Sequence, residues 1–347
     1  MQRFGAGTSD AIIVSMGATA DFLRRVARRA RRGFRRPEPQ PDPPPAIPVP
    51  PPMKPEEISA RHWDAYAAAG ENPEWTQHPL IETAVFRRIT GGVNKYWLNW
   101  LLEDKLEGPF ARALSLACGT GGHELVMART GKVARIDAFD LSPKSVAMAR
   151  DNARAAGFDN VNFFEAGFDD FDAKLGDATF DLVCFFGSLH HVREIETVLA
   201  AVHRRMTPGG RLVFNEYTGD CYVILDERKV AAINGLLEAL DPVFLNPDRP
   251  RHVNLTIDAM LGGDPSEGVR AALILPFLRH RFEIELLRPF GGAVLHMLYR
   301  CLDHKKMTDG SPESESIIRM LIEVDRMLYE DAGYLPSDFH VGICRKR

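Results

Sequence analysis

A glycine-rich loop and one aspartate are the clearest chemical signal in this chain of 347 residues. The loop at residues 118–122 reads CGTGG and follows a short apolar run, and Asp140 closes the next apolar run. A carboxylate in that place can accept both hydroxyls of a ribose. The third glycine of a dinucleotide-binding loop would fall on Glu124, whose charge would oppose a pyrophosphate. The pattern therefore predicts a ligand that has a ribose and no pyrophosphate.

A second group of candidate residues follows the apolar run at 180–186. His190 and His191 come shortly after it, and an imidazole that titrates near neutral pH suits removal of a proton from a hydroxyl or an amine. We predict His191 and His190 as catalytic bases, with packing or a backbone hydrogen bond as the alternative. Glu216 and Tyr217 end the next apolar run, and we expect them to face the substrate. For Glu216, a helix-capping or salt-bridging carboxylate is the alternative.

These residues must be positioned by the elements around them. Short apolar runs alternate with helical patterns, which predicts an α/β fold with a doubly wound parallel sheet. Such sheets bind ligands beyond the carboxyl ends of their strands. The expected strands are 113–117, 136–140, 161–165, 180–186, 211–216 and 282–287, and the expected helices are 123–130, 143–156, 192–206, 293–303 and 313–330.

The ordered motifs of residues 111–216 resemble those of the class I S-adenosylmethionine-dependent methyltransferases. LSLACGTG at 114–121 matches the first family motif, Asp140 in AFDLSPKSVAMAR falls on the ribose-binding acid, and Phe168 lies near the position that stacks on adenine. FDLVCFF, the SLHH that follows, and TPGGRLVF are similar to the later landmarks. The resemblance implies S-adenosylmethionine as cofactor and a seven-stranded Rossmann-like methyltransferase sheet whose last strand, 339–344, is antiparallel. It implies a cofactor site made of Ala117, Cys118, Gly119, Gly121, Asp140, Leu141, Ser142, Gly167, Phe168 and Ser188.

The sequence departs from the family pattern at three places. Ser115 stands where many members have an acidic residue, and Ala117 replaces the first glycine of the loop. Alanine at 117 costs little if its φ is negative. Gly167 occupies the place of an aspartate that commonly contacts the adenine amino group, which leaves Asp169 or Asp170, or water, to make that hydrogen bond.

Composition divides the chain into four segments. Residues 1–36 form an arm whose stretch DFLRRVARRARRGF sets apolar residues opposite arginines at helical spacing. This predicts either a weak contact with an anionic membrane surface or a solvated, disordered tail. Residues 37–57 are a Pro-rich linker, because 11 of the 24 prolines lie between Pro37 and Pro55. Residues 58–110, with all four tryptophans, are expected to form a helical cap, and 111–347 the methyltransferase-like domain, with a helical substrate insertion at about 218–264.

Charge and cysteine content limit the partners and the location. The net charge is −4, but residues 1–53 carry +5, which leaves −9 for the rest. Because phosphate contacts need a clustered basic surface, we expect no nucleic-acid partner. The five cysteines are odd in number and far apart, which favours neither a disulfide framework nor a metal site of paired cysteines, so no metal is expected. We expect a cytoplasmic protein, which is either free in solution or held at the inner face of the membrane by its arm.

The acceptor is expected to be a small molecule or a saccharide that bears a hydroxyl or an amine, methylated by direct SN2 transfer. The SLHHV loop, the NEY strand end and the DPSE segment resemble methyltransferases of bacterial secondary-metabolite and surface-polysaccharide pathways. A nicotinamide-dependent oxidoreductase would share the sheet and Asp140, but it predicts a third glycine near position 124 and a Tyr-x-x-x-Lys base, and neither is found. A non-catalytic, membrane-associated binding protein is the second alternative.

Overall fold

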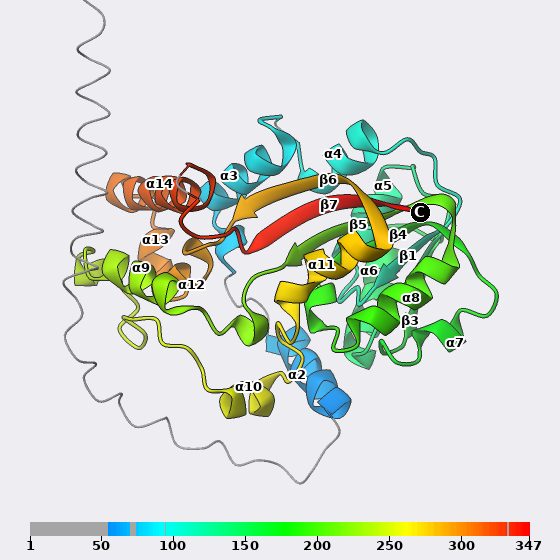
Figure 1. Ribbon diagram of the computed structural model, residues 1–347, viewed down its shortest axis with the longest axis horizontal. Coiled ribbons are helices and arrows are strands. Elements are labelled where there is room, and N and C mark those ends of the chain that lie inside the picture. The colour runs from blue at the N-terminus through cyan, green and yellow to red at the C-terminus, as the bar shows by residue number, and fades with distance from the viewer. Residues whose placement is uncertain (1–54, 70–73, 94, 332) are drawn as a thin grey trace, which may run out of the picture.

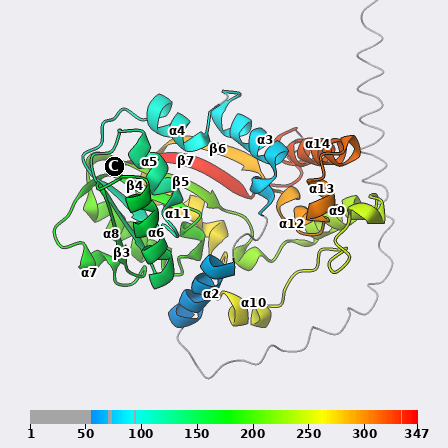
Figure 2. The same ribbon diagram turned by 180° about the vertical axis from the view of Figure 1, so that it is seen from behind.

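The computed structural model describes residues 55–69, 74–93, 95–331 and 333–347. The predictions for the arm at 1–36, and for the linker as far as residue 54, lie outside these residues. The described part of the chain forms one sheet with helices on both faces (Figures 1 and 2). None of its helices is both long enough and apolar enough to cross a lipid bilayer.

The sheet has seven strands in the order β3-β2-β1-β4-β5-β7-β6. β1 to β5 pair in parallel, whereas β7 runs antiparallel between β5 and β6. This confirms the predicted α/β fold with an antiparallel last strand. The strands are β1 (Ala113–Leu116), β2 (Ile136–Asp140), β3 (Val161–Glu165), β4 (Phe180–Phe186), β5 (Met206–Tyr217), β6 (Phe282–Gly291) and β7 (Phe339–Lys346).

Two hydrophobic cores lie on opposite faces of the sheet, because successive strand side chains alternate between its faces. One core joins Leu182 and Cys184 of β4 to α3 (Pro79–Thr90), α4 (Trp97–Trp100), α5 (Gly122–Arg129), α6 (Pro143–Ala155) and α14 (Pro312–Arg326). The other joins Val183 and Phe185 of the same strand to α7 (Phe171–Lys174), α8 (Ile195–Arg205) and α11 (Ile274–Arg281). Both faces are covered, which is why the central strands read as continuous apolar runs.

Additional helices gather at the carboxyl edge of the parallel strands. α2 (Pro55–Ala69) contacts both α6 and α10 (Ile257–Gly263), and the three lie together in Figure 2. α9 (Glu227–Leu237), α12 (Leu295–Tyr299) and α13 (His304–Met307) lie beyond the end of β5, near α14 (Figure 1). The segments before β1, after β5 and after β6 thus all reach the edge at which parallel sheets bind ligands.

Several predicted bounds were wrong, mostly at loops. α2 begins at Pro55, inside the expected linker, because proline is favoured in the first turn of a helix. β5 starts at Met206 and takes in the TPGG turn, and β6 continues to Gly291 as the partner of β7. The helix expected at 293–303 is two short ones, α12 and α13. The last helix ends at Arg326 and is followed by a π-helical turn, Met327–Asp331.

Candidate active site

The glycine loop and Asp140 form one hydrogen-bonded unit at the carboxyl ends of β1 and β2. Gly119 donates its backbone N–H to Asp140 Oδ2 at 2.8 Å, and Ser142 donates its N–H to Oδ1 at 2.9 Å. Asp140 is 8% exposed, and this burial raises the pKa of its carboxyl although the N–H donors oppose the rise. The carboxylate is therefore fixed between the loop and the start of α6.

Three residues of the loop have a left-handed backbone. Ala117 has φ +52°, Gly119 +53° and Gly121 +82°. Alanine at 117 was expected to cost little only if its φ were negative. Its φ is positive, so this residue costs about 1–2 kcal/mol of conformational strain. Strain of this kind is often found at functional sites. A Cβ on Gly121 would lie 2.8 Å from Phe163 Cζ and 3.1 Å from Ala149 Cβ, so α6 and β3 approach the loop too closely for a side chain there.

Helix α2 reaches the same unit from outside the sheet. Ser142 donates its hydroxyl to Asp64 on α2, and its oxygen also accepts the N–H of Ser145 at 3.0 Å, which caps α6. Ser142 is fully buried. The sequence predicted a helical cap at residues 58–110 without indicating which of its helices would touch the site. The structure assigns this contact to α2, whereas α3 packs against β6 and α14, and α4 packs against α5.

The adenine side of the predicted site lies at the end of β3. Phe168 is half-buried and meets Phe139 edge-on, with ring centroids 6.0 Å apart. Gly167 donates its N–H to Asp170 Oδ1 at 2.7 Å. Asp170 also pairs with a lysine four residues on at 2.6 Å. Asp170 is thus engaged within the protein, and the exposed Asp169 remains as the carboxylate available for the hydrogen bond expected at this place.

Glu124 and Ser115 form a buried contact beneath the loop. Ser115 donates its hydroxyl to Glu124 Oε1 at 2.5 Å, and Glu124 is 1% exposed. Within the described residues, Glu124 Oε2 has no hydrogen-bond partner. Burial raises the pKa of Glu124 to about 7, and the bond from Ser115 opposes the rise. The family resemblance leads one to expect an acidic residue at position 115 on β1. Here that position is Ser115, and the carboxyl beside it belongs to Glu124 on α5.

Glu216 holds the loop that follows β4. Its Oε1 accepts the N–H groups of Ser188 and Leu189 at 2.7 and 2.8 Å, and its Oε2 lies 2.8 Å from His190 Nδ1. Glu216 is 1% exposed. Tyr217 is 4% exposed and donates its hydroxyl to a backbone carbonyl at 2.9 Å. Both side chains are thus buried and bonded within the protein, which does not agree with the expectation that they face the acceptor. Glu216 instead has the alternative role of a capping carboxylate.

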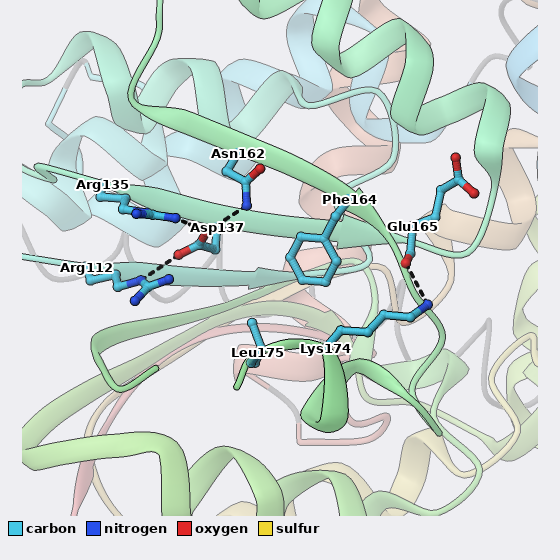
Figure 3. Close-up of a pocket in the computed structure, with 8 residues that line it drawn as sticks. All are labelled: Arg112, Arg135, Asp137, Asn162, Phe164, Glu165, Lys174 and Leu175. Carbon is cyan, nitrogen blue, oxygen red and sulfur yellow. Dashed lines mark hydrogen bonds and ion pairs between the residues drawn. The ribbon is translucent and has the colours of Figure 1, made fainter. Parts of the chain in front are cut away.

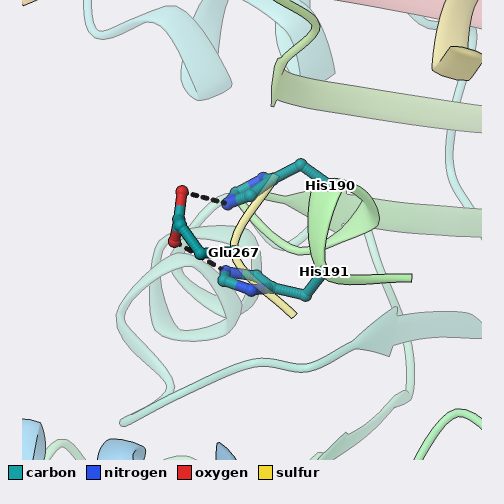
Figure 4. A group of neighbouring side chains, drawn as sticks. All are labelled: His190, His191 and Glu267. Carbon is teal, nitrogen blue, oxygen red and sulfur yellow. Dashed lines mark ion pairs between the residues drawn. The ribbon is translucent and has the colours of Figure 1, made fainter. Parts of the chain in front are cut away.

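His190 and His191 stand side by side with Glu267 across from them (Figure 4). The two ring centroids are 4.1 Å apart. His190 Nε2 lies 4.0 Å from Glu267 Oε1, and His191 Nε2 lies 3.9 Å from Oε2. Burial and the neighbouring His190 lower the pKa of His191 to about 4. Burial also opposes charge on His190, but the hydrogen bond and charge of Glu216 outweigh it and raise the pKa of that ring.

Residues far along the chain complete the surroundings of His191. Ser266 Oγ lies 3.1 Å from His191 Nδ1 and donates to Asp264 Oδ1 at 2.6 Å. Ser59 on α2 donates to the same Asp264 oxygen at 2.9 Å. Trp63, also on α2, meets the His191 ring edge-on at 5.1 Å between centroids. The end of the insertion and the cap helix therefore meet at this histidine.

A pocket runs along the strands from the start of β1 and β2 to the end of β3 and to α7 (Figure 3). It begins at the start of β1 and β2, where Asp137 pairs with Arg112 at 2.6 Å and with Arg135 at 3.2 Å. Asn162 donates to the same carboxylate at 2.9 Å. The two guanidinium groups thus share one carboxylate, and none of the predicted site residues lines this pocket.

Sequence reasoning missed the residues that the cap and the insertion contribute. The structure brings the predicted loop, Asp140, Ser142, Phe168 and the His190–His191 pair to one edge of the sheet. It adds a further set from α2 and from the segment after α10: Ser59, Trp63, Asp64, Asp264, Ser266 and Glu267. The DPSE segment was the one signal for the last three, since an acidic and hydroxyl-rich stretch between two apolar patterns marks a polar turn.

A family model matches part of this chain. Residues 113–210 match the model of a methyltransferase domain family. This range begins with β1 and ends within β5, so it contains the loop, Asp140, Phe168 and the histidine pair. The cap, the insertion and β6–β7 lie outside it.

Two curated proteins and one solved structure are similar to parts of this chain. The chain is 27% identical over 218 residues to a demethylmenaquinone methyltransferase of Thermus thermophilus, a match that covers 61% of this chain and 92% of that protein. It is 32% identical over 121 residues to the 27-O-demethylrifamycin SV methyltransferase of Amycolatopsis mediterranei, a match that covers 33% of this chain and 44% of that protein. The structure of an S-adenosylmethionine-dependent methyltransferase from Mesorhizobium loti superposes with a TM-score of 0.40 at 20% identity. The superposition covers 72% of this chain and 98% of that one.

Proposed function

We propose that this chain, which carries a class I S-adenosylmethionine-dependent methyltransferase domain over residues 113–210, methylates a hydroxyl or an amine of a small molecule or saccharide. The observation that carries the proposal is the unit made by the glycine loop and Asp140. It offers a fixed carboxylate for a ribose, while the buried Glu124 takes the place of the glycine that a pyrophosphate would need.

S-adenosylmethionine is the cofactor of this enzyme class, and we assign its parts to the edge described above. Asp140 already accepts two N–H groups, but a carboxylate has about four acceptor sites, so it can also take ribose hydroxyls. Ala117 to Gly119 and Gly121 would approach the cofactor through the backbone, and Leu141 and Ser142 would flank the ribose. Gly167 and Phe168 would receive the adenine, and Ser188 would close the methionine side.

The chemistry asks little of the protein beyond alignment. A sulfonium methyl group is already activated, so the enzyme must hold a nucleophile behind it and exclude water. Such positioning supplies up to about 7–11 kcal/mol in favourable cases. We assign His191 and His190 to the acceptor side, where an Nε2 lone pair can receive the acceptor's hydrogen bond and its proton. Glu216 is then a positioning residue, because it holds the backbone and one ring of this pair.

The acceptor class rests on the acidic body and on the surroundings of the histidine pair. A net charge of −9 outside the arm disfavours a polyanionic acceptor. Two relatives are named for small organic acceptors, one a demethylmenaquinone and the other a rifamycin that lacks its 27-O-methyl group. A mixed apolar and polar rim, with Trp63 beside His191, suits such a molecule.

Calorimetric titration with S-adenosylmethionine tests the cofactor assignment. Asp140→Ala should weaken binding by about 1.5–3 kcal/mol, the scale of a hydrogen bond to a charged group. Asp151→Ala, which removes an exposed carboxylate from α6, is the matched control and should bind like the wild type. Equal affinities of wild type and Asp140→Ala, or tighter binding of NADH than of S-adenosylmethionine, would contradict the assignment.

Transfer of a labelled methyl group tests the acceptor class. Phenols, amines and saccharides should be methylated, and His191→Ala should slow transfer without weakening cofactor binding. Transfer to tRNA or protein, with none to any small acceptor, would overturn this part of the proposal.

A further inference from the structure

We propose that His190, His191 and Glu267 bind one divalent transition-metal ion of the zinc class on the acceptor side of the site. One ligand atom from each of the three residues lies within 4.8 Å of the other two (Figure 4). The location on the acceptor side rests on the proposed function, whereas metal binding itself does not. The cysteine spacing predicted no metal site, but these ligands are histidines and a glutamate that come from two distant segments.

The hydrogen bonds of His190 leave its Nε2 available as a ligand. Nδ1 lies 2.8 Å from Glu216 Oε2, and an ionised carboxylate can only accept, so Nδ1 carries the proton. In the neutral ring the lone pair is then on Nε2, which faces Glu267 at 4.0 Å.

The bonds of His191 lead to the same tautomer. Ser266 donates its hydroxyl hydrogen to Asp264 Oδ1 at 2.6 Å, so its oxygen accepts the N–H of His191 Nδ1 at 3.1 Å. Asp264 Oδ2 lies 3.5 Å from the same nitrogen. His191 Nε2 therefore also carries a lone pair, and it faces the second oxygen of Glu267 at 3.9 Å.

Three acceptors thus converge with no donor between them. The distances of 3.9 and 4.0 Å are too long for hydrogen bonds. Zinc binds nitrogen and oxygen at about 2.0–2.2 Å in tetrahedral geometry, so two ligand atoms of one ion lie about 3.3–3.6 Å apart. Both gaps to Glu267 exceed this separation by about 0.3–0.7 Å, which a movement of its half-exposed side chain can close.

The charge around the cluster also calls for a cation. Glu216, Asp264 and Glu267 all lie within 4.0 Å of an imidazole nitrogen. In the part of the chain that the structure describes, none of these carboxylates pairs with a lysine or an arginine. Asp264 is 7% exposed, and its Oδ2 is one of the few buried side-chain oxygens without a hydrogen-bond partner there. A divalent ion would compensate this concentration of negative charge.

The contacts of the two Nδ1 atoms, which face away from Glu267, fit a metal site. A ligating histidine usually donates its other N–H to a carboxylate, a carbonyl or water, which fixes the ring and raises its basicity. Glu216 does this for His190, and the Ser266–Asp264 pair does it for His191. Two imidazoles and one carboxylate suit zinc, cobalt or nickel rather than magnesium, which prefers oxygen ligands.

An ion held by three protein groups keeps at least one position open for the acceptor. A nitrogen that binds the ion cannot also take the acceptor's proton. With the ion bound, a hydroxyl acceptor would lose its proton to solvent because the ion lowers its pKa, and His191 would act as a ligand instead of a base.

Titration of the full chain, stripped with EDTA and then desalted, tests the proposal. Calorimetry with Zn²⁺ and Co²⁺ should give one site per chain, and Mg²⁺ should give none. Glu267→Gln and His191→Ala should each weaken binding at least about tenfold. Glu238→Gln and His280→Ala, at exposed positions elsewhere, are matched controls and should bind like the wild type. Residues 1–54 contain no histidine or cysteine that could compete for the ion.

The ligand type and the fold are checked in the same samples. The Co²⁺ absorption spectrum should lack a thiolate charge-transfer band, which excludes Cys118 and Cys221 as the site. Zn²⁺ should raise the melting temperature of the wild type and not that of Glu267→Gln, each relative to its own value in EDTA.

A wild type that binds no better than Glu267→Gln would refute the metal site and favour protonated imidazoles as the compensating charge. Titration with S-adenosylmethionine in EDTA keeps the two proposals separable. If the cofactor binds while the metal does not, the methyltransferase proposal stands alone. If the metal binds while the cofactor does not, the metal site stands and the proposed function fails.

Discussion

Individual residues set the electrostatics of the cofactor edge, and most of them are carboxylates held by a small number of donors. Asp140 has two backbone N–H groups, Glu216 has backbone N–H groups and a histidine ring, and Glu124 has one serine hydroxyl. A buried carboxylate with fewer donors is held less well in its charged form. Glu124 is therefore the residue of this edge whose charge depends most on pH.

The pKa of about 7 at Glu124 predicts a pH dependence of stability. The folded protein keeps a proton there that the unfolded chain, with the ordinary value of 4.5, releases. The contribution of the protonated Glu124 carboxyl to the free energy of unfolding is therefore fully present below about pH 4.5, and it is lost as the pH rises towards 7. At pH 8, Glu124→Gln should therefore exceed the wild type in free energy of unfolding by up to about 3 kcal/mol, and at pH 4.5 the difference should vanish. Denaturant unfolding without cofactor at both pH values measures this, and a difference independent of pH would contradict it.

The close approach at Gly121 predicts that only glycine is tolerated there. Gly121→Ala would combine a φ of +82° with a contact of 2.8 Å to Phe163, and should lower the free energy of unfolding by about 1–3 kcal/mol. Gly122→Ala is the matched control, because its Cβ would meet nothing within 4 Å and alanine suits the first turn of α5. Urea denaturation of the two variants compares them, and equal stability would show that the loop can relax.

At the scale of elements, the helices added to the sheet are tied to it by buried polar bonds as well as by apolar packing. Lys229 of α9 is 1% exposed and lies 2.6 Å from Asp338, just before β7, and 2.8 Å from Asp220, just after β5. Asp325 of α14 accepts the N–H groups of Val294 and Leu295 at the start of α12. These bonds fix the helices that follow the sheet relative to its carboxyl edge.

Loss of the Lys229 ammonium should therefore loosen α9. Lys229→Met leaves Asp338, which is 1% exposed, without its cationic partner, and should cost about 3–5 kcal/mol of stability. Arg228→Met changes the neighbouring exposed residue of the same helix and should cost less than about 1 kcal/mol. Thermal unfolding distinguishes the two. Equal losses in both variants would show that the buried ion pair does not hold the helix.

At the scale of the whole molecule, charge is distributed unequally between the arm and the rest. Residues 1–53 carry +5 and the remainder −9, and a Pro-rich stretch separates the two. The arm and most of this stretch lie outside the described residues, so their role stays a prediction from sequence. An Arg-rich segment with few large apolar side chains predicts weak binding to anionic lipid.

Deletion of residues 1–52 should separate location from catalysis. We expect the melting temperature and the affinity for S-adenosylmethionine to change little, while binding to vesicles that contain acidic lipid is lost. Vesicle binding by the full chain should also fall as salt shortens the Debye length below about 10 Å. Sedimentation with acidic and with neutral vesicles measures this. A deletion variant that unfolds or loses the cofactor would show that the arm docks on the body.

The sequence by itself determined the sheet and the cofactor edge of this protein. Strand periodicity, the CGTGG loop and Asp140 are local patterns, and each is produced by residues that are neighbours along the chain. Their order predicted the parallel strands and the placing of the loop beside Asp140, while the family resemblance implied the antiparallel β7, and the structure contains all three. The sign of φ at Ala117 did not follow, since it depends on how tightly the loop turns between β1 and α5.

Only the tertiary structure decided what surrounds His191 and where Glu216 points. Ser266 lies 75 positions from His191 along the chain, and Ser59 lies 205 positions from Asp264, yet hydrogen bonds join each pair. No local pattern encodes such contacts, because they arise when the cap and the insertion pack over the same edge of the sheet. Glu216 was foreseen at the right edge, but its direction depends on unsatisfied N–H groups of the loop after β4. Buried donors must be paired, and only the folded chain shows which acceptor is near enough to pair with them.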